Sequence, residues 1–387
     1  MAKKHHISLR LVKVIAIIFT VIVAVALVYS AFGGRTDPKE NALGSIAVLA
    51  YPFLLGLAVF LGLMWVVVRR WLHSIVVWVA ILLTWPTFSV VCPFNIKEHK
   101  YTAQEDSTKF KVLTFNVENF HVKYSGDDKK DMEDASQTIR YILDQDADVV
   151  LLQEASLSTD FNNLKVSPKL MKELKTKYPY RDHGYHDQVI WSKHPYEPVV
   201  DDSIKNGFAS PDDPVSNYHF AARAFDVLIP GHSVRFFNLH LQSLSLSHED
   251  RQFYENITNL KAKTETKDLK QSSKSIYSKL KTAFVKHTEE AKIIRQVIDL
   301  SDENVIVCGD FNDVPASYAY RMILGNDLAD AWVKCGFAPT TTFNSNHLFF
   351  KIDHMMYRGD MQAVEIHRDK AGCSDHYPLV TTFVWKR

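Results

Sequence analysis

Three uninterrupted apolar runs lie in the first quarter of the chain, over residues 14–32, 46–68 and 75–91, and none contains a charged residue. A helix that crosses a bilayer core of roughly 30 Å needs about 20 apolar residues. The first two runs reach that length, and the third does so with the apolar residues that precede it. A buried helix of a soluble protein, apolar on every face, is the alternative. The pattern favours three membrane-spanning helices, which form a membrane anchor over residues 1–95.

Basic residues flank these runs in a pattern that predicts their orientation. Four lysines and arginines lie between positions 3 and 13, and Arg69 and Arg70 separate the second run from the third. Short cytoplasmic segments of membrane proteins carry an excess of such residues. We therefore expect a cytoplasmic N terminus and, after three crossings, an extracytoplasmic domain. A cleaved signal peptide is the alternative for the first run, although its apolar stretch exceeds the usual length of about 7–15 residues.

Beyond a polar linker over residues 96–108, short apolar runs alternate with helical patterns. Strands are predicted over residues 109–115, 148–154, 189–192, 221–228, 234–241, 305–308 and 379–385. Helices are predicted over residues 132–145 and about 245–300, where apolar residues recur at helical spacing. Such alternation is typical of an α/β domain with buried sheets, here over residues 109–387.

Charge is divided unevenly between the two parts of the chain. Residues 1–100 carry 10 Lys+Arg against 3 Asp+Glu, which gives +7, and the remainder carries 35 against 41, which gives −6. An acidic domain argues against a protein that coats nucleic acid by bulk attraction. One local exception is the segment 261–286, with eight lysines against two acids. It reads as an amphipathic helix that has either a solvated face or a face for anionic lipid or another polyanion.

The four cysteines do not form a metal-binding pattern. The sequence contains no CxxC and no paired Cys/His spacing, so a structural zinc site is not expected. Cys308 lies in an apolar strand and reads as a core residue. Whether Cys335 and Cys373 pair stays open.

Polar side chains that can take part in catalysis or metal binding follow six of the apolar runs. They are Asn116 with Glu118, Glu154, His240 with Gln242, Asp310 with Asn312, Asp353 with His354, and the triplet Ser374, Asp375 and His376. One such ending is an ordinary turn, because Gly, Asp and Asn favour turns. Six of them predict that strand ends meet at a common polar pocket, where α/β proteins usually place their sites.

The motifs at these positions are FNVENF, LLQEA, NLHLQS, GDFND, KIDHMMY and GCSDHYPL, in this order. Over about residues 108–387 they resemble the endonuclease/exonuclease/phosphatase superfamily, which has the deoxyribonuclease-I-like fold. The combination of GDFND with a C-terminal SDHYPL is specific, whereas either motif alone is weak. The resemblance implies a two-sheet α/β sandwich, here preceded by three transmembrane helices. It also implies metal-dependent hydrolysis of a phosphoester.

The resemblance implies a metal site as well. Glu154 is the expected metal ligand, Asn116 its neutral partner, and Asp375 lies near the metal. Hard divalent cations take oxygen ligands, and Mg²⁺ usually takes one or two carboxylates in addition to water and substrate phosphate. We expect Mg²⁺, with Mn²⁺ as the alternative.

Catalytic roles follow for the remaining motif residues. Asp310 is expected to orient or deprotonate the attacking water, as a general base does. Asn312 is expected to donate its amide hydrogens to a phosphoryl oxygen, and Asp313 to cap the following turn. His376, when protonated, would stabilise negative charge on the phosphate. Asp353 is expected to orient its imidazole.

Other residues are weaker candidates. His240 matches the position that would bind the scissile phosphate. Arg223 reads either as a phosphate contact or as a surface ion pair, and Tyr185 to Asp187 either face the substrate or belong to a surface loop. His354 replaces an aromatic residue that is usual in the superfamily, and we expect it to alter the pocket wall.

These inferences predict a membrane-anchored, divalent-metal-dependent hydrolase of phosphate esters. Its substrate is a nucleic acid, a nucleotide, a phospholipid or a sugar phosphate, its second partner is membrane lipid, and no protein partner is inferred. The alternative is a catalytically inactive, membrane-tethered binding or scaffold domain of the same fold. Such a copy would be expected to lack one or more of the Glu, Asp and His residues. A calcineurin-like metallophosphatase is excluded, because no GNH[DE] element follows GDFND.

Overall fold

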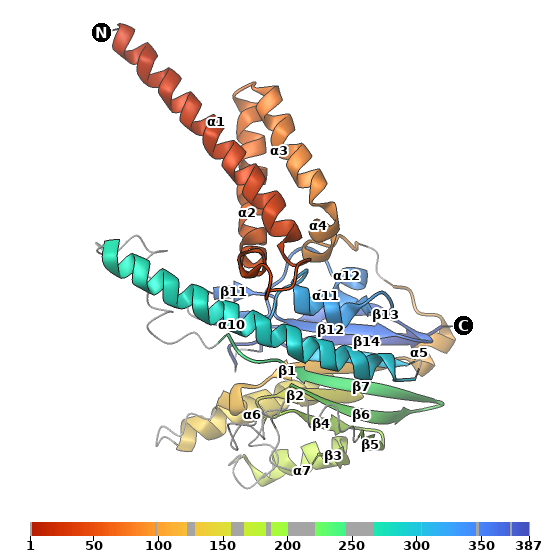
Figure 1. The fold of residues 1–387 in the computed structure, drawn as a ribbon. Coiled ribbons are helices and arrows are strands. Elements are labelled where there is room, and N and C mark those ends of the chain that lie inside the picture. The colour runs from red at the N-terminus through yellow and green to blue at the C-terminus, as the bar shows by residue number, and fades with distance from the viewer. Residues whose placement is uncertain are drawn as a thin grey trace.

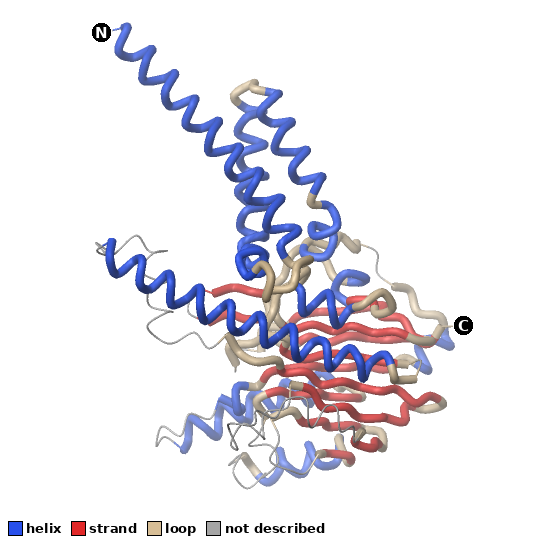
Figure 2. The backbone as a smooth tube through the Cα atoms, in the orientation of Figure 1, coloured by secondary structure: helices blue, strands red, loops and turns tan. Residues whose placement is uncertain are grey.

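The computed structural model describes residues 2–96, 99–121, 128–155, 166–182, 187–199, 221–244, 266–302, 304–345, 348–371 and 374–386. A helical stalk, made of α1 to α4, stands on a domain of stacked sheets flanked by helices (Figures 1 and 2). The helices of the stalk are α1 (Ala2–Gly33), α2 (Ala42–Val67), α3 (Trp71–Leu83) and α4 (Trp85–Val91).

Among the described residues, two helical stretches are long and apolar enough to cross a membrane, Leu11–Gly33 and Ala42–Val67. The third expected span is broken, since α3 and α4 meet at an angle of 71°. Pro86 lies in the first turn of α4, where its missing N–H and fixed φ suit the start of a new helix rather than the continuation of the old one. The stalk thus holds two spans, or three if the bent pair is one.

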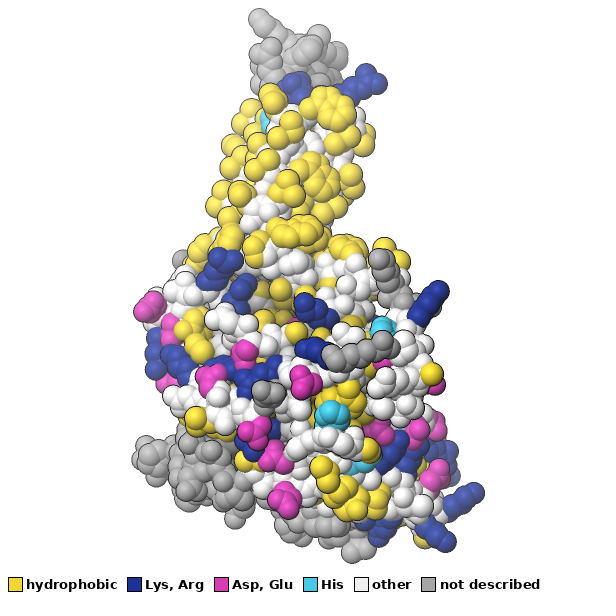
Figure 3. Space-filling model, turned by 90° about the vertical axis from the view of Figure 1, so that its right-hand side faces the viewer, with side chains coloured by type: hydrophobic (Ala, Val, Ile, Leu, Met, Phe, Trp, Pro, Cys, Tyr) yellow, Lys and Arg dark blue, Asp and Glu magenta, His cyan; other side chains and the backbone are white. Residues whose placement is uncertain are grey.

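The surface of the stalk differs from that of the domain. On the face shown in Figure 3, hydrophobic side chains cover most of the described part of the stalk, whereas charged side chains of both signs are spread over the domain below it. Val67 and Leu72 are 81% and 77% exposed. A continuous apolar surface of this size is unfavourable in water and marks a lipid or protein contact.

Two six-stranded sheets form the domain. The first has the order β13-β14-β1-β2-β4-β3 and the second β5-β6-β7-β8-β12-β9. Strands of the first sheet are β1 (Phe110–Asn116), β2 (Val149–Gln153), β3 (Tyr180–Arg181), β4 (Val189–Ser192), β13 (Met361–Arg368) and β14 (Leu379–Trp385). Strands of the second are β5 (Tyr196–Pro198), β6 (Ala222–Ile229), β7 (His232–His240), β8 (Val305–Asp310), β9 (Ala329–Asp330) and β12 (Asp353–Arg358). A separate hairpin pairs β10 (Phe343–Ser345) with β11 (Leu348–Phe350).

Alternation along the strands builds three apolar layers. Val112 of β1 and Phe236 of β7 lie in the cluster between the sheets. Leu113 faces the outer cluster beneath α6 (Asp128–Gln145) and α7 (Pro168–Lys177), which contains Ile139 and Leu174. Because successive side chains point to opposite faces, both sheets are covered on both sides. The expected two-sheet α/β sandwich is confirmed.

The opposite outer layer lies against β7 and β8. Its cluster joins Phe237 of β7 to Ile294 of α10 and Ile323 of α11. The remaining helices are α5 (Ala103–Thr108), η1 (Glu118–His121), α10 (Thr266–Asp299), α11 (Tyr318–Leu324) and α12 (Ala331–Cys335). In the Lys-rich segment, Leu280 and Phe284 of α10 are buried, as an amphipathic helix requires, while residues 245–265 lie outside the described residues.

Strand register gathers the polar strand ends. The parallel pair β7 and β8 sets His240 beside Asp310, and antiparallel β12 sets Asp353 on the other side of Asp310. We expected an apolar strand to end at Asp353, but this residue begins β12. An antiparallel strand starts at the edge where its neighbour ends, so the acid still reaches the same edge. Gly309 has φ +131, and a Cβ there would lie 2.1 Å from the Leu239 carbonyl oxygen, so only glycine lets β8 approach β7 this closely.

The stalk packs directly on the domain. A Cβ added to Gly34, just after α1, would lie 2.0 Å from the Ala316 carbonyl oxygen, in the loop that follows GDFND. After α4, the Asn95 Nδ2 donates to the carbonyl oxygens of Val333 and Gly336 at 3.0 and 2.8 Å. The expected polar linker contains the short helix α5, which starts at a capping box formed by Thr102 and Glu105.

The cysteines do not bear on a metal site among the described residues. Cys308 is fully buried in β8, as expected. Cys335 is free, and its Sγ donates to the Ala363 carbonyl oxygen at 3.0 Å. Its suggested partner, Cys373, lies outside the described residues.

Candidate active site

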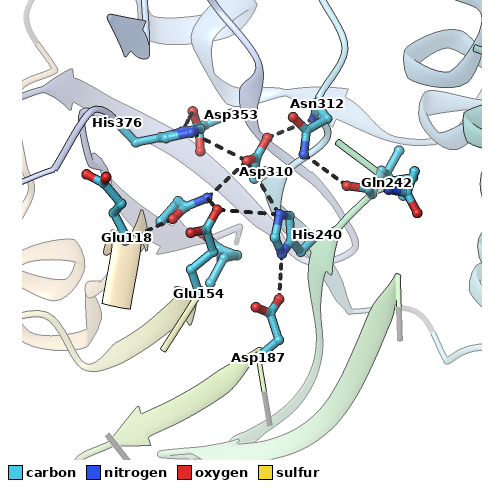
Figure 4. A network of polar contacts seen from close by, with 12 residues as sticks. Glu118, Glu154, Asp187, His240, Gln242, Asp310, Asn312, Asp353 and His376 are labelled. Carbon is cyan, nitrogen blue, oxygen red and sulfur yellow. Dashed lines mark hydrogen bonds and ion pairs between the residues drawn. The ribbon is translucent and has the colours of Figure 1, made fainter. Parts of the chain in front are cut away.

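Asp310 lies at the centre of a polar cluster at one edge of the two sheets (Figure 4). Its carboxylate is 1% exposed. Oδ1 accepts a hydrogen bond from the backbone N–H of Asn312 at 2.8 Å, and Oδ2 accepts one from Asn116 Nδ2 at 3.1 Å. The Nε2 atoms of His376 and His240 lie 3.6 and 3.9 Å from the same Oδ2. Burial raises the pKa of Asp310, and the two imidazoles oppose that rise.

His376 is held between two carboxylates. Its Nδ1 lies 2.9 Å from Asp353 Oδ2, while Nε2 faces Asp310. Burial alone would lower the pKa of His376, but the negative charges of Asp353 and Asp310 raise it to about 10. The imidazole is therefore a cation at neutral pH. Ser374 Oγ accepts a hydrogen bond from the His376 backbone N–H at 3.0 Å, which fixes the segment before β14.

His240 has a carboxylate partner of its own, Asp187, whose Oδ2 lies 2.5 Å from Nδ1. Burial alone would lower the pKa of His240, but Asp187 raises it to about 9. Asp187 was expected either at the substrate or in a surface loop, and the pairing with His240 was not expected. The sequence feature that could have pointed to Asp187 is its position as an acid just before the apolar strand β4. Tyr185 and His186 lie outside the described residues.

Glu154 stands at the open side of the cluster. Its side chain is 34% exposed, and Oε1 lies 3.9 Å from His240 Nε2. Oε1 also accepts a hydrogen bond from Asn116 Nδ2 at 3.0 Å. The amide of Asn116 thus bridges the carboxylates of Glu154 and Asp310, which would otherwise repel each other.

Three residues of the cluster have left-handed backbone conformations. The φ angles are +49° at Glu154, +47° at Asn312 and +45° at Glu118. Such conformations cost about 1–3 kcal/mol each for residues with a Cβ, and they concentrate at functional sites. At each of these three residues the backbone turns sharply after a strand, so that the side chain points into the cluster.

A buried amide pair ties the two sheets together behind the site. Gln153, at the end of β2, donates from Nε2 to Asn238 Oδ1 at 2.6 Å. Asn238, on β7, donates in turn to the Leu152 and Val189 carbonyl oxygens at 2.9 and 3.1 Å. Both side chains are fully buried. The pair fixes the distance between Glu154 in one sheet and His240 in the other.

The donor set fits a hard divalent cation. Burial raises the pKa of Asp375 to about 6. The negative charges of Glu118, Glu154 and Asp310 contribute to this rise, and His376 opposes it. Four carboxylates therefore share one electrostatic environment. The carboxylates of Asp310 and Asp353 add further oxygen donors on either side of the His376 cation, within 4.8 Å of its ring nitrogen. Oxygen donors in excess of nearby positive charge are what Mg²⁺ requires.

Several sequence candidates lie apart from this cluster. Arg223 forms an ion pair with Asp182 and donates to the Gln188 carbonyl oxygen at 2.7 Å. His354 is fully buried, with Nε2 donating to the Asp313 carbonyl oxygen at 2.9 Å. Because it is fully buried, His354 lies in the interior and not in a pocket wall. Its Nδ1 lies 2.7 Å from Lys351 Nζ.

The loop after β7 is tied to α10. Gln242 donates from its backbone N–H to Glu290 Oε2 at 3.0 Å and accepts from Lys286 Nζ at 2.8 Å (Figure 4 shows Gln242 beside Asn312). Asn312 donates from Nδ2 to the Leu241 carbonyl oxygen at 2.9 Å. Asp313 turns away from the cluster and faces the buried His287 at 3.5 Å.

Two family descriptions match the chain. The endonuclease/exonuclease/phosphatase family matches residues 113–376, about two thirds of the chain. A domain of unknown function, DUF8431, matches residues 12–91. No curated protein matches the sequence.

The solved structures to which this chain is similar share little sequence with it. Humanized D. rerio TDP2 is 16% identical, with 71% of this chain and 99% of that chain covered and a TM-score of 0.43. A family protein from Bacteroides thetaiotaomicron is 17% identical, with coverages of 72% and 99% and a TM-score of 0.43. The mannosyl-6-phosphatase of that bacterium is 15% identical, with coverages of 71% and 100% and a TM-score of 0.41. The matched region contains Asn116, Asp310 and His376 and covers more than half of the chain. This chain belongs to the endonuclease/exonuclease/phosphatase family.

Proposed function

We propose that this protein is a membrane-anchored, divalent-metal-dependent phosphoesterase that cleaves a P–O bond by in-line attack of water. The observation that carries the proposal is the meeting of two acid–histidine pairs, Asp353–His376 and Asp187–His240, at the Asp310 carboxylate. Phosphate-ester hydrolysis needs a proton acceptor for water and positive charge beside the phosphoryl oxygens. This cluster contains both.

Asp310 is the proposed proton acceptor. Burial raises its pKa, which makes it a stronger base than an exposed carboxylate. Asn312 and Asn116 hold its two oxygens, so the carboxylate is fixed before substrate arrives. A positioned general base typically contributes about 10²- to 10⁴-fold to a rate.

The two imidazoles supply positive charge from the protein. His376 and His240, with pKa values of about 10 and 9, carry protons at neutral pH and can donate to phosphoryl oxygens. Asn312 uses one amide N–H for the Leu241 carbonyl oxygen, and its other N–H, which has no partner among the described residues, would donate to substrate.

Glu154 and Asn116, with Asp375 close by, are the residues that would hold the cation. A divalent cation bound there would neutralise charge on the phosphoryl oxygens and on the leaving oxygen. The residues Glu154 and Asn116 come from the sheet opposite that of Asp310, so substrate would be held between the two sheets.

The proposed orientation places the catalytic domain outside the cytoplasm. Arg69 and Arg70 lie in the turn between α2 and α3, at the end of the stalk far from the domain, on the same side as the N terminus (Figure 1). Exposed Trp71 and Trp85 lie near opposite ends of α3, as interfacial aromatic residues do. Labelling of an Asp360→Cys variant in intact cells by a membrane-impermeant maleimide tests this orientation, and absence of labelling would oppose it.

Hydrolysis by the full-length protein in detergent tests the activity. The substrates are DNA, a phospholipid, a small phosphodiester and a small phosphomonoester, each with Mg²⁺, Mn²⁺ or chelator. We expect metal-dependent turnover of at least one class, lost in Asp310→Asn and kept in Asp360→Asn, whose carboxyl is exposed at the β12–β13 turn. Folded protein that binds Mg²⁺ but cleaves none of the four would favour the binding or scaffold alternative.

A further inference from the structure

A cavity of about 340 Å³ lies where the stalk meets the catalytic domain. Val48, Pro52 and Phe53 of α2 form one wall, and Val314 and Phe350 of the domain contribute to the other. This volume lies within the range of ligand pockets, about 300–1,000 Å³, which are mostly apolar with a few placed polar groups. The Phe53 and Phe350 rings meet edge to face, with centroids 6.3 Å apart.

The segments that line this cavity also carry the catalytic cluster. Val314 follows Asn312 by two residues, and Lys351 precedes Asp353 by two. Phe343 packs in one apolar cluster with Val48 of α2. The same Phe343 ring lies 5.0 Å from the His376 imidazole. The cavity is therefore one side chain away from the catalytic histidine.

One wall of the cavity belongs to a helix that is apolar enough to cross a membrane. With a rise of about 1.5 Å per residue, the segment from Ala42 to Phe53 covers only about 16 Å from the domain end of α2. Phe53 is 53% exposed on the stalk, and Phe349 is 45% exposed on β11. Apolar surface thus continues from the outside of the stalk to the edge of the cavity.

One cationic side chain lies among these apolar residues. Arg368 lines the cavity, and its guanidinium lies 4.8 Å from the centre of the Tyr377 ring, next to His376. Within the described part of the chain, no carboxylate forms an ion pair with it. Lys351, by contrast, directs Nζ to His354 and lies 3.8 Å from Asp330. Arg368 is available for an anionic group beside hydrocarbon.

We propose that the cavity takes up the acyl chain of a phospholipid, so that the substrate of the catalytic site is a lipid of the surrounding bilayer. The α2 wall receives the chain, and Arg368 meets the charge of the headgroup. The statement on the substrate rests on the proposed phosphoesterase function, whereas the binding of the chain does not.

Photolabelling tests the binding of the chain without reference to catalysis. The full-length protein is placed in nanodiscs of phosphatidylglycerol that contain a diazirine in one acyl chain. After irradiation, we expect label on the peptides with residues 339–341 and 349–351, in addition to the helices of the stalk. Thr340→Trp, which fills the cavity, should remove most label from these domain peptides. Thr282→Trp, on the exposed face of α10, should leave it unchanged. Label confined to α1–α4 would overturn the proposal.

Turnover of two esters with one headgroup tests the substrate class. Dioleoyl- and dibutanoyl-phosphatidylglycerol are compared in the wild type and in Thr340→Trp. We expect kcat/KM for the long-chain ester to fall by about tenfold or more, because even one methylene excluded from an apolar pocket weakens binding measurably. The short-chain ester should change by less than about twofold. Equal losses, or none, would refute the role of the cavity. If neither ester is cleaved, the phosphoesterase proposal fails for this lipid class, and the photolabelling result still decides whether the cavity holds a chain.

Discussion

Replacing Asp353 by asparagine removes one negative charge from His376 and keeps the shape of the side chain. The Asp353 Oδ2 lies 2.9 Å from Nδ1 of the imidazole, whose pKa is about 10. Two unit charges about 3 Å apart interact by roughly 5.5 kcal/mol at an effective dielectric constant near 20. At about 1.4 kcal/mol per pKa unit, this corresponds to about four units. The pKa of His376 should therefore fall to about 6 in Asp353→Asn.

The change should appear in the pH dependence of turnover. In the wild type, His376 stays protonated up to about pH 10, so it contributes no alkaline loss of activity near neutrality. In Asp353→Asn, activity should decline above about pH 6, and the rate at pH 7 should be about tenfold below that of the wild type, because about one His376 in ten keeps its proton one pH unit above its pKa. The assay is kcat/KM from pH 5 to 10 at saturating Mg²⁺, with Asp360→Asn as the matched control. An alkaline limb that does not move in Asp353→Asn would refute the reasoning.

Three further predictions concern the other charges. Asp187→Asn should lower the pKa of His240 from about 9 and reduce activity by about 10- to 100-fold; a pH–rate profile identical to that of the wild type would contradict this. Asp330→Asn leaves the buried Lys351 without its carboxylate, and should lower the free energy of unfolding by about 3–5 kcal/mol near pH 7 in urea titrations. The pKa of Asp330 is lowered in the folded state, so its contribution to stability is present above its unfolded pKa and is lost as the pH falls. The difference in the free energy of unfolding between variant and wild type should therefore become smaller in acid. Mg²⁺ at about 100 times its Kd should stabilise the wild type by about 2.7 kcal/mol, and Glu154→Gln should show a much smaller rise in melting temperature.

Much of the candidate site could be predicted from the sequence, because apolar strands and polar strand ends are local features. The runs that lead to Asn116 and Asp310 are strands β1 and β8. The pattern predicts that a strand ends at Asp353, whereas this residue begins β12. Both assignments place it at the same edge, because β12 runs antiparallel to β8. A short apolar run does not show whether the polar residue beside it begins the strand or ends it.

The pairing partners could not be predicted in the same way. Asp187 and His240 are far apart in the sequence and meet only because β4 and β7 lie in sheets that pack face to face. The break in the third apolar run is a competition between hydropathy, which favours one span, and Pro86, which starts a new helix after Thr84. The contact of Gly34 with Ala316 is likewise a property of packing, and no local pattern announces it.

The central claim is that Asp310 directs water onto the phosphorus of a phosphate ester. Hydrolysis of the best substrate in ¹⁸O-enriched water, followed by ³¹P NMR or mass spectrometry of the phosphate-containing product, tests it most directly. The account predicts one ¹⁸O atom in each product phosphate, formed only with divalent metal, and product formation lowered at least about 100-fold in Asp310→Asn. Label in the alcohol instead of the phosphate, or an Asp310→Asn rate equal to that of the wild type, would contradict it.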